Sequence, residues 1–178
     1  MNIILFIYYK LLLYKMNIPL KYLPKRLTKK DKIKQAKQLK KSRNAYKKRI
    51  YIHRKPLDSY NKKKSKHLLN AEKIYKIKNL TINKELANKT GCSLNALNKI
   101  VKKGQGAYYS SGSRPNQTAH SWGIARLASS ISGGKAAAID YNILEEGCKS
   151  GSKALKLAKK SRIKNGYGTR KVPKIKLN

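Results

Sequence analysis

The distribution of charge constrains this chain more than any other feature of its sequence. Lys and Arg number 44 against 7 Asp and Glu, which gives a formal net charge of +37 at pH 7. Residues 104–148 are the exception, because they include three basic and three acidic residues and are neutral as a stretch. Self-repulsion at such a charge opposes compaction unless a polyanion supplies counter-charge. The sequence therefore predicts a neutral folded module with basic arms that contact an anionic partner.

Nucleic acid is the partner that this charge favours. Each phosphate neutralised by Lys or Arg releases condensed counterions, so affinity is high at low salt and falls steeply as salt rises. An AT-rich genome would also raise the Lys content, but it does not account for the shortage of Asp and Glu. An anionic membrane surface would attract the same charge and is the less favoured partner. We therefore expect the chain to bind DNA or RNA.

Length and cysteine content limit the other classes of protein. The 178 residues suffice for one ordinary domain or two very small ones. Cys92 and Cys148 are far apart, and the three histidines are scattered, so the chain lacks the spacing of a zinc site. We expect two free thiols in a reducing compartment, no metal and no cofactor.

Residues 2–15 form an apolar run, NIILFIYYKLLLYK. The run is too short for a comfortable transmembrane helix, and it lacks the basic leader and cleavage site of a signal peptide. A second Met-Asn-Ile begins at Met16. Residues 1–15 are therefore expected to be a mis-assigned start or a short apolar extension, with a short membrane anchor as the alternative.

Hydrophobic spacing predicts a mainly α fold. A basic helix is expected over 29–48, because Thr28 and Asp31 resemble a capping box ahead of Ile33, Ala36 and Leu39. The other expected elements are helices over 65–77, 118–132 and 140–146, two short helices over 82–102, and a loop or β-hairpin over 104–116.

The charge pattern divides these elements into four segments. After residues 1–15, we expect a basic N-terminal arm with one helix over 16–64. A helical hairpin and the neutral Gly/aromatic module follow over 65–148. Residues 149–178 carry eleven basic residues and no acid. They are expected to form a largely disordered basic tail, in which 154–160 become helical when bound.

Residues 82–101 fit a helix-turn-helix and read INKELANKTGCSLNALNKIV. Ala87 is small enough for two helices to cross, and Gly91 tolerates the positive φ of the turn. Four apolar residues would hold the two helices together: Leu86, Cys92, Leu97 and Ile100.

The outward face of the second helix would carry the residues that contact nucleic acid. Asn pairs bidentately with adenine in the major groove, and Lys reaches guanine or phosphate. The candidates on this face are Asn95, Asn98, Lys99, Lys102 and Lys103. The alternative is a helical hairpin that only packs against the neutral module.

A long motif occupies the neutral module. It reads Gly-x-Gly-Ala-Tyr-Tyr-Ser-Ser-Gly-Ser-Arg-Pro-Asn-Gln-Thr, followed by Ser-Trp-Gly-x-Ala-Arg-Leu-Ala-Ser, Gly-Gly-Lys and Asp-Tyr. The motif resembles that of an uncharacterised family of small basic proteins from giant nucleocytoplasmic DNA viruses, and a shorter form is seen in tailed-phage proteins. The resemblance covers roughly Ile18 to Cys148. It implies a viral origin and transfers no catalytic role.

Two readings of the module stay open. Tyr108 and Tyr109 either pack in the core or stack on bases. Arg114 lies in a Gly/Ser loop, where it could hold a phosphate with help from Ser110, Ser111 and Ser113. Structural roles are expected for Trp122 in packing, and for Arg126 and Asp140 as an ion pair.

Catalysis is not favoured. The sequence lacks a nucleophile elbow and the spacing of a P-loop, and the module offers few carboxylates for a metal nuclease. We therefore predict no catalytic residues and a DNA-binding viral protein, a virion or genome-packaging component found in the virion or in viral factories of the host cytoplasm. The alternatives are an internal capsid protein that docks on another virion protein and, less favoured, a nucleic-acid-processing enzyme.

Overall fold

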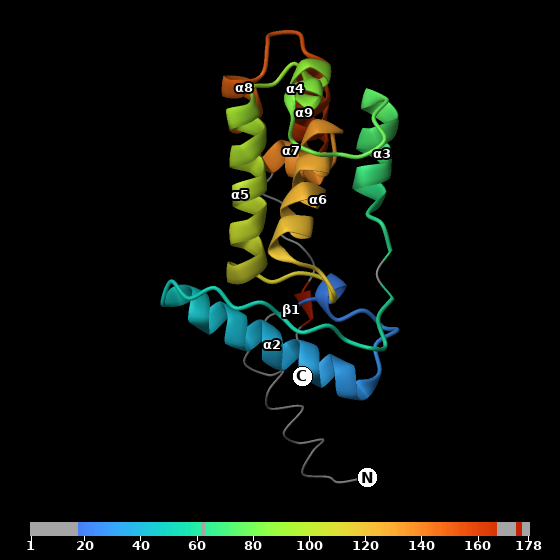
Figure 1. The fold of residues 1–178 in the computed structure, drawn as a ribbon, viewed down its shortest axis with the longest axis vertical. Coiled ribbons are helices and arrows are strands. Elements are labelled where there is room, and N and C mark those ends of the chain that lie inside the picture. Colours follow the sequence, from blue (N-terminus) through green and yellow to red (C-terminus); the bar gives the residue numbers. More distant parts are fainter. Residues whose placement is uncertain (1–17, 62, 167–173, 176–178) are drawn as a thin grey trace. The chain divides into compact units, whose positions relative to one another are not determined.

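The computed structural model describes residues 18–61, 63–166 and 174–175, and the mainly α fold is confirmed (Figure 1). Residues 1–15 lie outside the described residues. Strands β1 (Ile18–Pro19) and β2 (Lys174–Ile175) pair antiparallel, and a 3-10 turn, η1 (Leu20–Tyr22), follows β1. The helices are α2 (Lys29–Lys47), α3 (Lys66–Tyr75), α4 (Lys84–Thr90), α5 (Leu94–Ser110), α6 (Ala119–Ile131), α7 (Lys135–Ile139), α8 (Tyr141–Gly147) and α9 (Lys153–Lys164).

The chain divides into two compact units that differ from the expected segments. Among the described residues, the first unit comprises 18–61, 107–118 and 174–175, and the second comprises 63–106 and 119–166. Part of the expected neutral module therefore folds with the N-terminal segment. Most of the expected C-terminal tail folds into the second unit.

In the first unit, the basic N-terminal segment is folded around α2 rather than extended as an arm. The Thr28 hydroxyl accepts a hydrogen bond from the Asp31 amide at 3.3 Å, which gives one half of the expected capping box. The Asp31 carboxylate instead accepts bonds from the backbone N–H and hydroxyl of Ser59, at 3.0 and 2.6 Å. Ala36 and Leu39 on the same helix are buried in the unit.

Residues 107–118 are held in the first unit by amide side chains. The Gln35 side chain donates to the carbonyl oxygens of Tyr22 and Ser113. Asn116 accepts from the Leu57 N–H at 2.7 Å and donates to the carbonyls of Leu57 and Tyr60. These buried bonds satisfy polar groups that a purely apolar core would leave unpaired.

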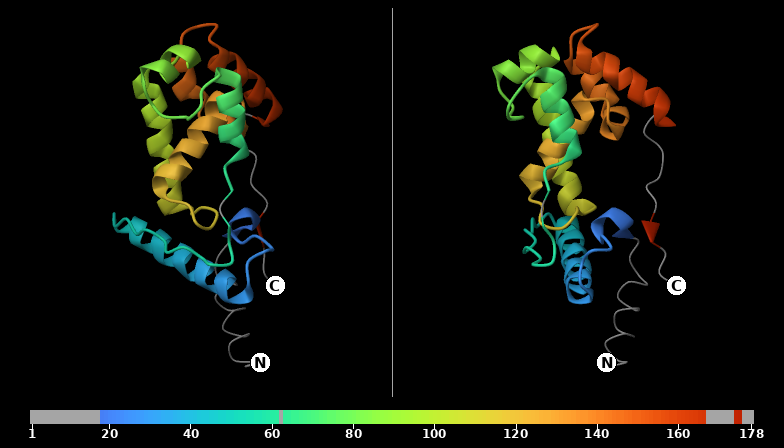
Figure 2. Two further views of the ribbon diagram at one scale, coloured as in Figure 1. Left: turned by 45° about the vertical axis from the view of Figure 1, so that its right-hand side comes forward. Right: turned by 90° about the vertical axis from the view of Figure 1, so that its right-hand side faces the viewer.

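In the second unit, helices α3 to α9 all contribute to one apolar core. Figure 2 shows α9 in red-orange against this helical layer, and contacts join α9 to α6, α7 and α8. Ala154 and Ala158 of α9 are fully buried. The expectation of a disordered tail is therefore wrong for Lys153–Lys164, because small apolar residues at helical spacing give this basic helix one buried face.

The loop or β-hairpin expected over 104–116 is wrong for 104–110, since α5 continues as a helix to Ser110, and the loop is confined to 111–116. Gly104 is needed for helix packing instead of a turn. A Cβ at Gly104 would lie 2.7 Å from the Cα of Gly123 in α6, so the two helices can cross this closely only without side chains. The left-handed turn comes later, at Gly112, where φ is +96°.

The two cysteines form a disulfide, which overturns the expectation of free thiols. The Ser93 N–H donates to the Gly147 carbonyl and the Lys149 N–H to the Gly91 carbonyl, each at 2.7 Å. These bonds flank an antiparallel bridge between Cys92 and Cys148, the arrangement in which facing side chains lie closest. The fold thus joins two residues that are 56 positions apart in sequence.

Candidate nucleic-acid interface

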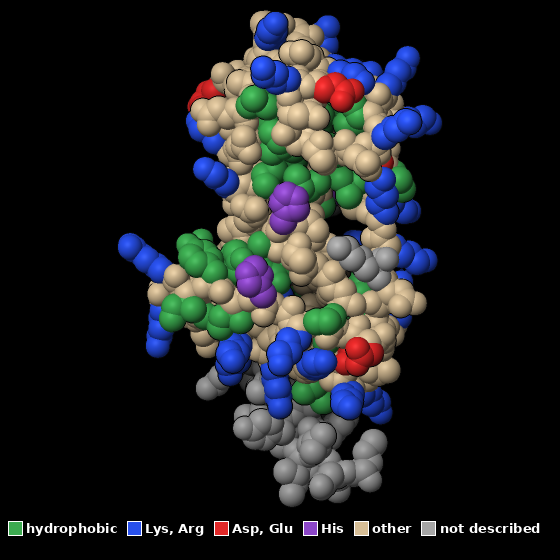
Figure 3. Space-filling view, in the orientation of Figure 1, with side chains coloured by type: hydrophobic (Ala, Val, Ile, Leu, Met, Phe, Trp, Pro, Cys, Tyr) green, Lys and Arg blue, Asp and Glu red, His purple; other side chains and the backbone are tan. Residues whose placement is uncertain are grey.

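The outer face of α2 carries a line of cations. The helix has nine basic residues and one acidic residue in 19 positions, and it is about 28 Å long. Among the ion pairs of residues 18–61 and 63–166, none involves α2. Figure 3 shows basic side chains in blue along this helix. Its exposed cations are Lys29, Lys30, Lys37, Lys40, Lys41 and Lys47.

An arginine cluster forms behind this face, within the first unit. The Arg54 guanidinium lies 3.6 Å from the centre of the Tyr108 ring and donates to the Tyr108 carbonyl at 3.0 Å. It also donates to the hydroxyls of Ser42 and Ser113, at 3.1 and 2.7 Å. Burial lowers the pKa of Arg54 from its ordinary value. These partners are neutral, so they position the guanidinium without cancelling its charge.

Arg43 and Arg114 extend the cluster. Arg43 donates two hydrogen bonds to the Ser111 carbonyl, at 3.2 and 2.6 Å. Arg114 is exposed. Burial raises the pKa of the Tyr22 hydroxyl, and the charges of Arg43, Arg54 and Arg114 act on it in the opposite direction. Three guanidinium groups therefore lie within electrostatic range of one ring.

The serines predicted to help Arg114 bind phosphate are not equivalent. Ser113 is fully buried, and its hydroxyl donates to the Arg114 carbonyl while accepting from Arg54. It is therefore engaged in structure. Ser110 and Ser111 are exposed, with their hydroxyl oxygens 3.4 Å apart. Of the three serines, only Ser110 and Ser111 therefore stay candidates for helping Arg114 to bind a phosphate.

Helices α4 and α5 have the local features expected of the hairpin. Gly91 ends α4 in the left-handed region, with φ +72°, and the Ser93 hydroxyl accepts from the Ala96 N–H at the start of α5. Ala87 packs against the core at its margin. The four apolar residues expected to hold the helices together are all buried: Leu86, Cys92, Leu97 and Ile100.

The predicted contact residues on α5 differ in availability. Asn95, Asn98, Lys99 and Lys102 are exposed at positions i, i+3, i+4 and i+7, so they share one helical face. Lys103 is engaged elsewhere: its ammonium lies 3.0 Å from the Asp140 carboxylate. Lys103 is therefore removed from the set of candidate phosphate contacts.

Three aromatic residues of the module differ in how accessible their rings are to a base. Tyr108 is only 1% exposed and packs under Arg54, so its ring is closed to a base. Tyr109 is half-buried on the last turn of α5. Trp122 is half-buried on α6. The Tyr109 ring contacts that of Tyr108 edge to face at 5.0 Å and also contacts other aromatic rings at the surface of the first unit.

Arg126 and Asp140 form the expected ion pair. The guanidinium donates to both carboxylate oxygens, at 2.8 and 2.6 Å, and the Ser130 hydroxyl adds a bond at 2.8 Å. Burial alone would raise the pKa of Asp140, but these partners and Lys103 outweigh it and lower the pKa. The carboxylate is thus not free to cap α8, and α7, which the sequence did not predict, leads directly into that helix.

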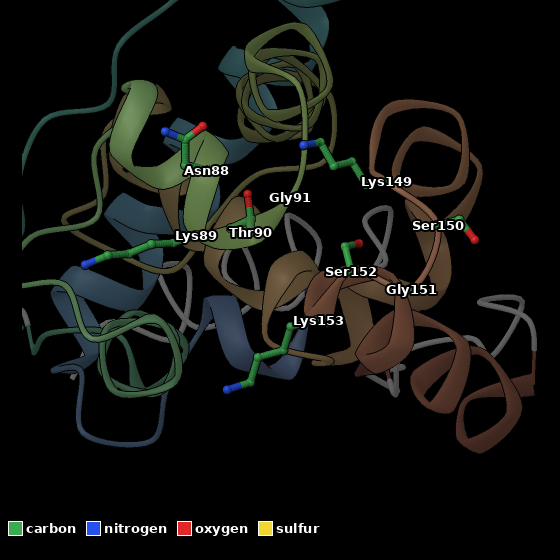
Figure 4. A pocket seen from close by; sticks show the side chains of 9 residues that line it. All are labelled: Asn88, Lys89, Thr90, Gly91, Lys149, Ser150, Gly151, Ser152 and Lys153. Carbon is green, nitrogen blue, oxygen red and sulfur yellow. The ribbon is translucent and has the colours of Figure 1, made fainter.

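A depression of about 320 Å³ lies in the second unit, between the end of α4 and the start of α9 (Figure 4). Its cations are Lys89, Lys149 and Lys153. Figure 4 shows their ammonium groups apart from one another, without converging on one point. Lys89 is paired with Glu85 at 2.8 Å. The depression therefore adds positive surface but does not provide a converging set of donors for one ligand.

The described part of the chain has no group of three or more His, Cys, Asp or Glu residues placed to hold a metal ion. Within the same residues, no helix has both the length and the apolar character needed to cross a membrane.

Sequence reasoning missed a group of four aromatic residues and one adjoining apolar residue, which we call the tyrosine patch: Tyr46, Tyr51, His53 and Tyr109, with Ile50. All of these except Tyr109 lie in the segment YKKRIYIHRK (46–55), where aromatic rings alternate with five cations. Aromatic residues interleaved with basic ones are typical of single-stranded nucleic-acid binding. That pattern could have been read from the sequence, although the addition of Tyr109 could not.

Comparison with known proteins gives a family. The model described as "Family of unknown function (DUF5824)" matches residues 19–144. The match runs from the first unit into α8 and stops before α9. No curated protein and no solved structure matches the chain.

Proposed function

The chain belongs to the family of unknown function DUF5824, and we propose that it is a nucleic-acid-binding protein whose affinity comes mainly from phosphate contacts. The observation that carries this proposal is the exposed lysine face of α2, which has no carboxylate partner in the described residues. With 7 carboxylates for 44 basic side chains, most cations of the chain cannot be neutralised internally. A polyphosphate would supply the missing counter-charge.

We further propose a viral protein that binds DNA in a virion or during genome packaging. The resemblance of the motif over 104–141 to proteins of giant DNA viruses supports a viral origin. The Cys92–Cys148 disulfide favours a location in the virion rather than in the reducing cytosol, because disulfides rarely persist in the cytosol. The protein acts by binding, without catalysis.

The salt dependence of DNA affinity tests this proposal. If six or more phosphates are neutralised, affinity for a duplex should fall by about 10³-fold or more between about 50 and 200 mM salt. Replacing Lys37, Lys40, Lys41 and Lys47 with Gln should reduce the slope of log affinity against log salt by about 3 to 4, since each lost contact contributes about 0.9. Fluorescence anisotropy with a labelled duplex measures both quantities.

Lys→Arg changes at the same four positions are the matched control, because they keep the charge and should keep the slope. Failure to bind either DNA or RNA at low salt would refute the proposal. Retention on one protein partner at high salt, without DNA affinity, would instead favour the alternative of an internal capsid protein that docks on another virion protein.

The exposed face of α5 makes a separate prediction about sequence preference. If Asn98 and Lys99 read base edges in a groove, the double change to Ala should reduce discrimination between preferred and scrambled duplexes by roughly 5- to 150-fold, the value of one bidentate base contact. Both side chains are exposed, so the unfolding midpoint should stay unchanged. Selection from a random duplex library measures the effect. An unaltered preference would reject groove reading by α5.

A further inference from the structure

The tyrosine patch has features that phosphate contacts alone do not explain. Tyr51 is 62% exposed and Ile50 54% exposed, next to each other at the surface of the first unit. Figure 3 shows a group of green side chains, with a purple histidine beside it, near the C-terminal end of α2. Isolated exposed apolar residues are ordinary, but a contiguous exposed apolar group usually marks an interaction site.

Contacts between the rings of the tyrosine patch fix their arrangement. The Tyr109 ring is at the centre, with its centroid 5.1 Å from that of Tyr51 and 5.9 Å from that of His53, both edge to face. Tyr46 lies parallel to Tyr109 at 6.5 Å and edge to face with Tyr51 at 5.9 Å. Tyr51 is thus held on two neighbours while much of its surface stays open. A ring restrained in this way loses little conformational freedom when a ligand stacks on it.

A Schellman motif ends α2 just before Tyr51, with a basic residue at its left-handed position. The Ile50 N–H donates to the Ala45 carbonyl and the Arg49 N–H to the Tyr46 carbonyl, the pair of bonds that ends a helix in a Schellman motif. Arg49 occupies the left-handed position of that motif, with φ +61°, where glycine is the usual residue. Lys47, Lys48 and Arg49 are all exposed. Three consecutive exposed basic residues therefore come immediately before Ile50 and Tyr51 in the chain.

We propose that the tyrosine patch is a stacking platform for unpaired bases, so that this protein binds single-stranded nucleic acid. Charge complementarity selects this occupant: phosphates would contact Lys47, Lys48 and Arg49 while a base stacks on the exposed ring of Tyr51. Proteins that bind single strands without sequence preference use basic side chains to contact the phosphates and aromatic rings to stack on the bases. Bases of an intact duplex are already stacked on one another and cannot use the platform. This inference rests on the proposed function and adds its substrate class.

Three ligands with equal numbers of phosphates test the inference on the full chain: a short oligothymidylate, the matching oligouridylate, and an abasic oligomer. Wild-type protein should bind at least one of the two base-bearing oligomers more tightly than the abasic one, and comparing them shows whether the platform prefers DNA or RNA. Tyr51→Ala should weaken binding of that oligomer by roughly 5- to 150-fold, the range for one stacked base. Its affinity for the abasic oligomer and for duplex should change by less than about twofold, because phosphate contacts are intact.

Two variants serve as controls. Tyr51→Phe keeps the ring and should retain the affinity of wild type for both base-bearing oligomers. Ile163→Ala removes an apolar side chain that is 77% exposed on α9, in the other unit, and should have no effect.

The outcomes separate the two proposals. Equal binding of base-bearing and abasic oligomers would overturn the stacking platform and leave the phosphate-contact function standing. A preference for bases that survives Tyr51→Ala would also overturn the platform, because the stacking would then occur elsewhere. Absence of binding to all three ligands would overturn the platform, and absence of binding to duplex as well would refute both proposals.

Discussion

Replacement of Asp140 by Ala should destabilise the second unit by about 3–5 kcal/mol, the cost of leaving a buried charge without its partner. The Asp140 side chain is 0% exposed and is paired with Arg126, whose side chain is 18% exposed. Typical domains unfold at a cost of about 5–15 kcal/mol, so the loss would be a large fraction of the total. Denaturant titration followed by circular dichroism gives the free energy of unfolding.

Three variants separate the ion pair from simple loss of packing. Lys103→Met should cost less than about 1 kcal/mol, because Lys103 is 45% exposed and its pair with Asp140 is solvated on one side. Adding Arg126→Met to Asp140→Ala should recover part of the loss, because it removes the stranded guanidinium. Asp140→Asn keeps the side-chain shape and should fall between wild type and Asp140→Ala. An unchanged free energy of unfolding in Asp140→Ala would contradict the structural role assigned to the pair.

The same carboxylate predicts a pH dependence. Its pKa is lowered in the folded chain, so it is ionised more readily there than in the unfolded chain, where the ordinary Asp value is about 3.9. The stabilisation is complete above that value and is lost as the pH falls through the lower folded-state pKa. Hydrogen bonds from Ser59 lower the pKa of Asp31 in the same direction. The free energy of unfolding should therefore be measured against pH, in the acid range, for wild type and for Asp140→Asn. The difference between the two curves gives the contribution of the Asp140 carboxylate to stability.

Loss of the Cys92–Cys148 disulfide is the second large expected effect. A crosslink that closes 56 residues restricts the unfolded chain by about 4 kcal/mol on the chain-entropy model. For a unit of this size, about 4 kcal/mol corresponds to a fall of at least about 15 °C in the unfolding midpoint. Thermal unfolding with and without a reducing agent, followed by circular dichroism, measures the difference.

The Cys92→Ala/Cys148→Ala double variant should behave like reduced wild type and should not respond to reductant. Alkylation of the denatured, unreduced protein should add no mass, since the structure has no free cysteine. Two alkylated thiols in freshly purified protein, or equal midpoints in the oxidised and reduced states, would show that the bond does not stabilise this unit.

Local sequence signals determined most helix positions and several caps. Thr28 caps α2 as the sequence predicts, and Gly91 takes the left-handed turn between α4 and α5. Arg126 and Asp140 pair as expected, because a buried guanidinium needs an acceptor and this neutral stretch offers few carboxylates. The caps and the turn depend on residues that are close in sequence, and the ion pair follows from the small number of carboxylates. Both kinds of information are present in the sequence alone.

Tertiary structure decided the features that depend on distant residues. Gly104 and Gly106 suggested a turn by themselves, but the approach of Gly123 makes Gly104 a packing position inside a long helix. The disulfide depends on a bridge between segments that sequence spacing does not reveal.

Some features of the candidate interface could likewise be predicted from the sequence, and others required the tertiary structure. Its charge was evident from composition, because net charge is additive along the chain. The sequence did not show that Tyr108 and Lys103 are unavailable as nucleic-acid contacts. It also did not show that the rings of Tyr109 and Tyr51 are in contact. These depend on which side chains the fold buries, pairs or leaves exposed, and such burial is a property of the packed chain as a whole.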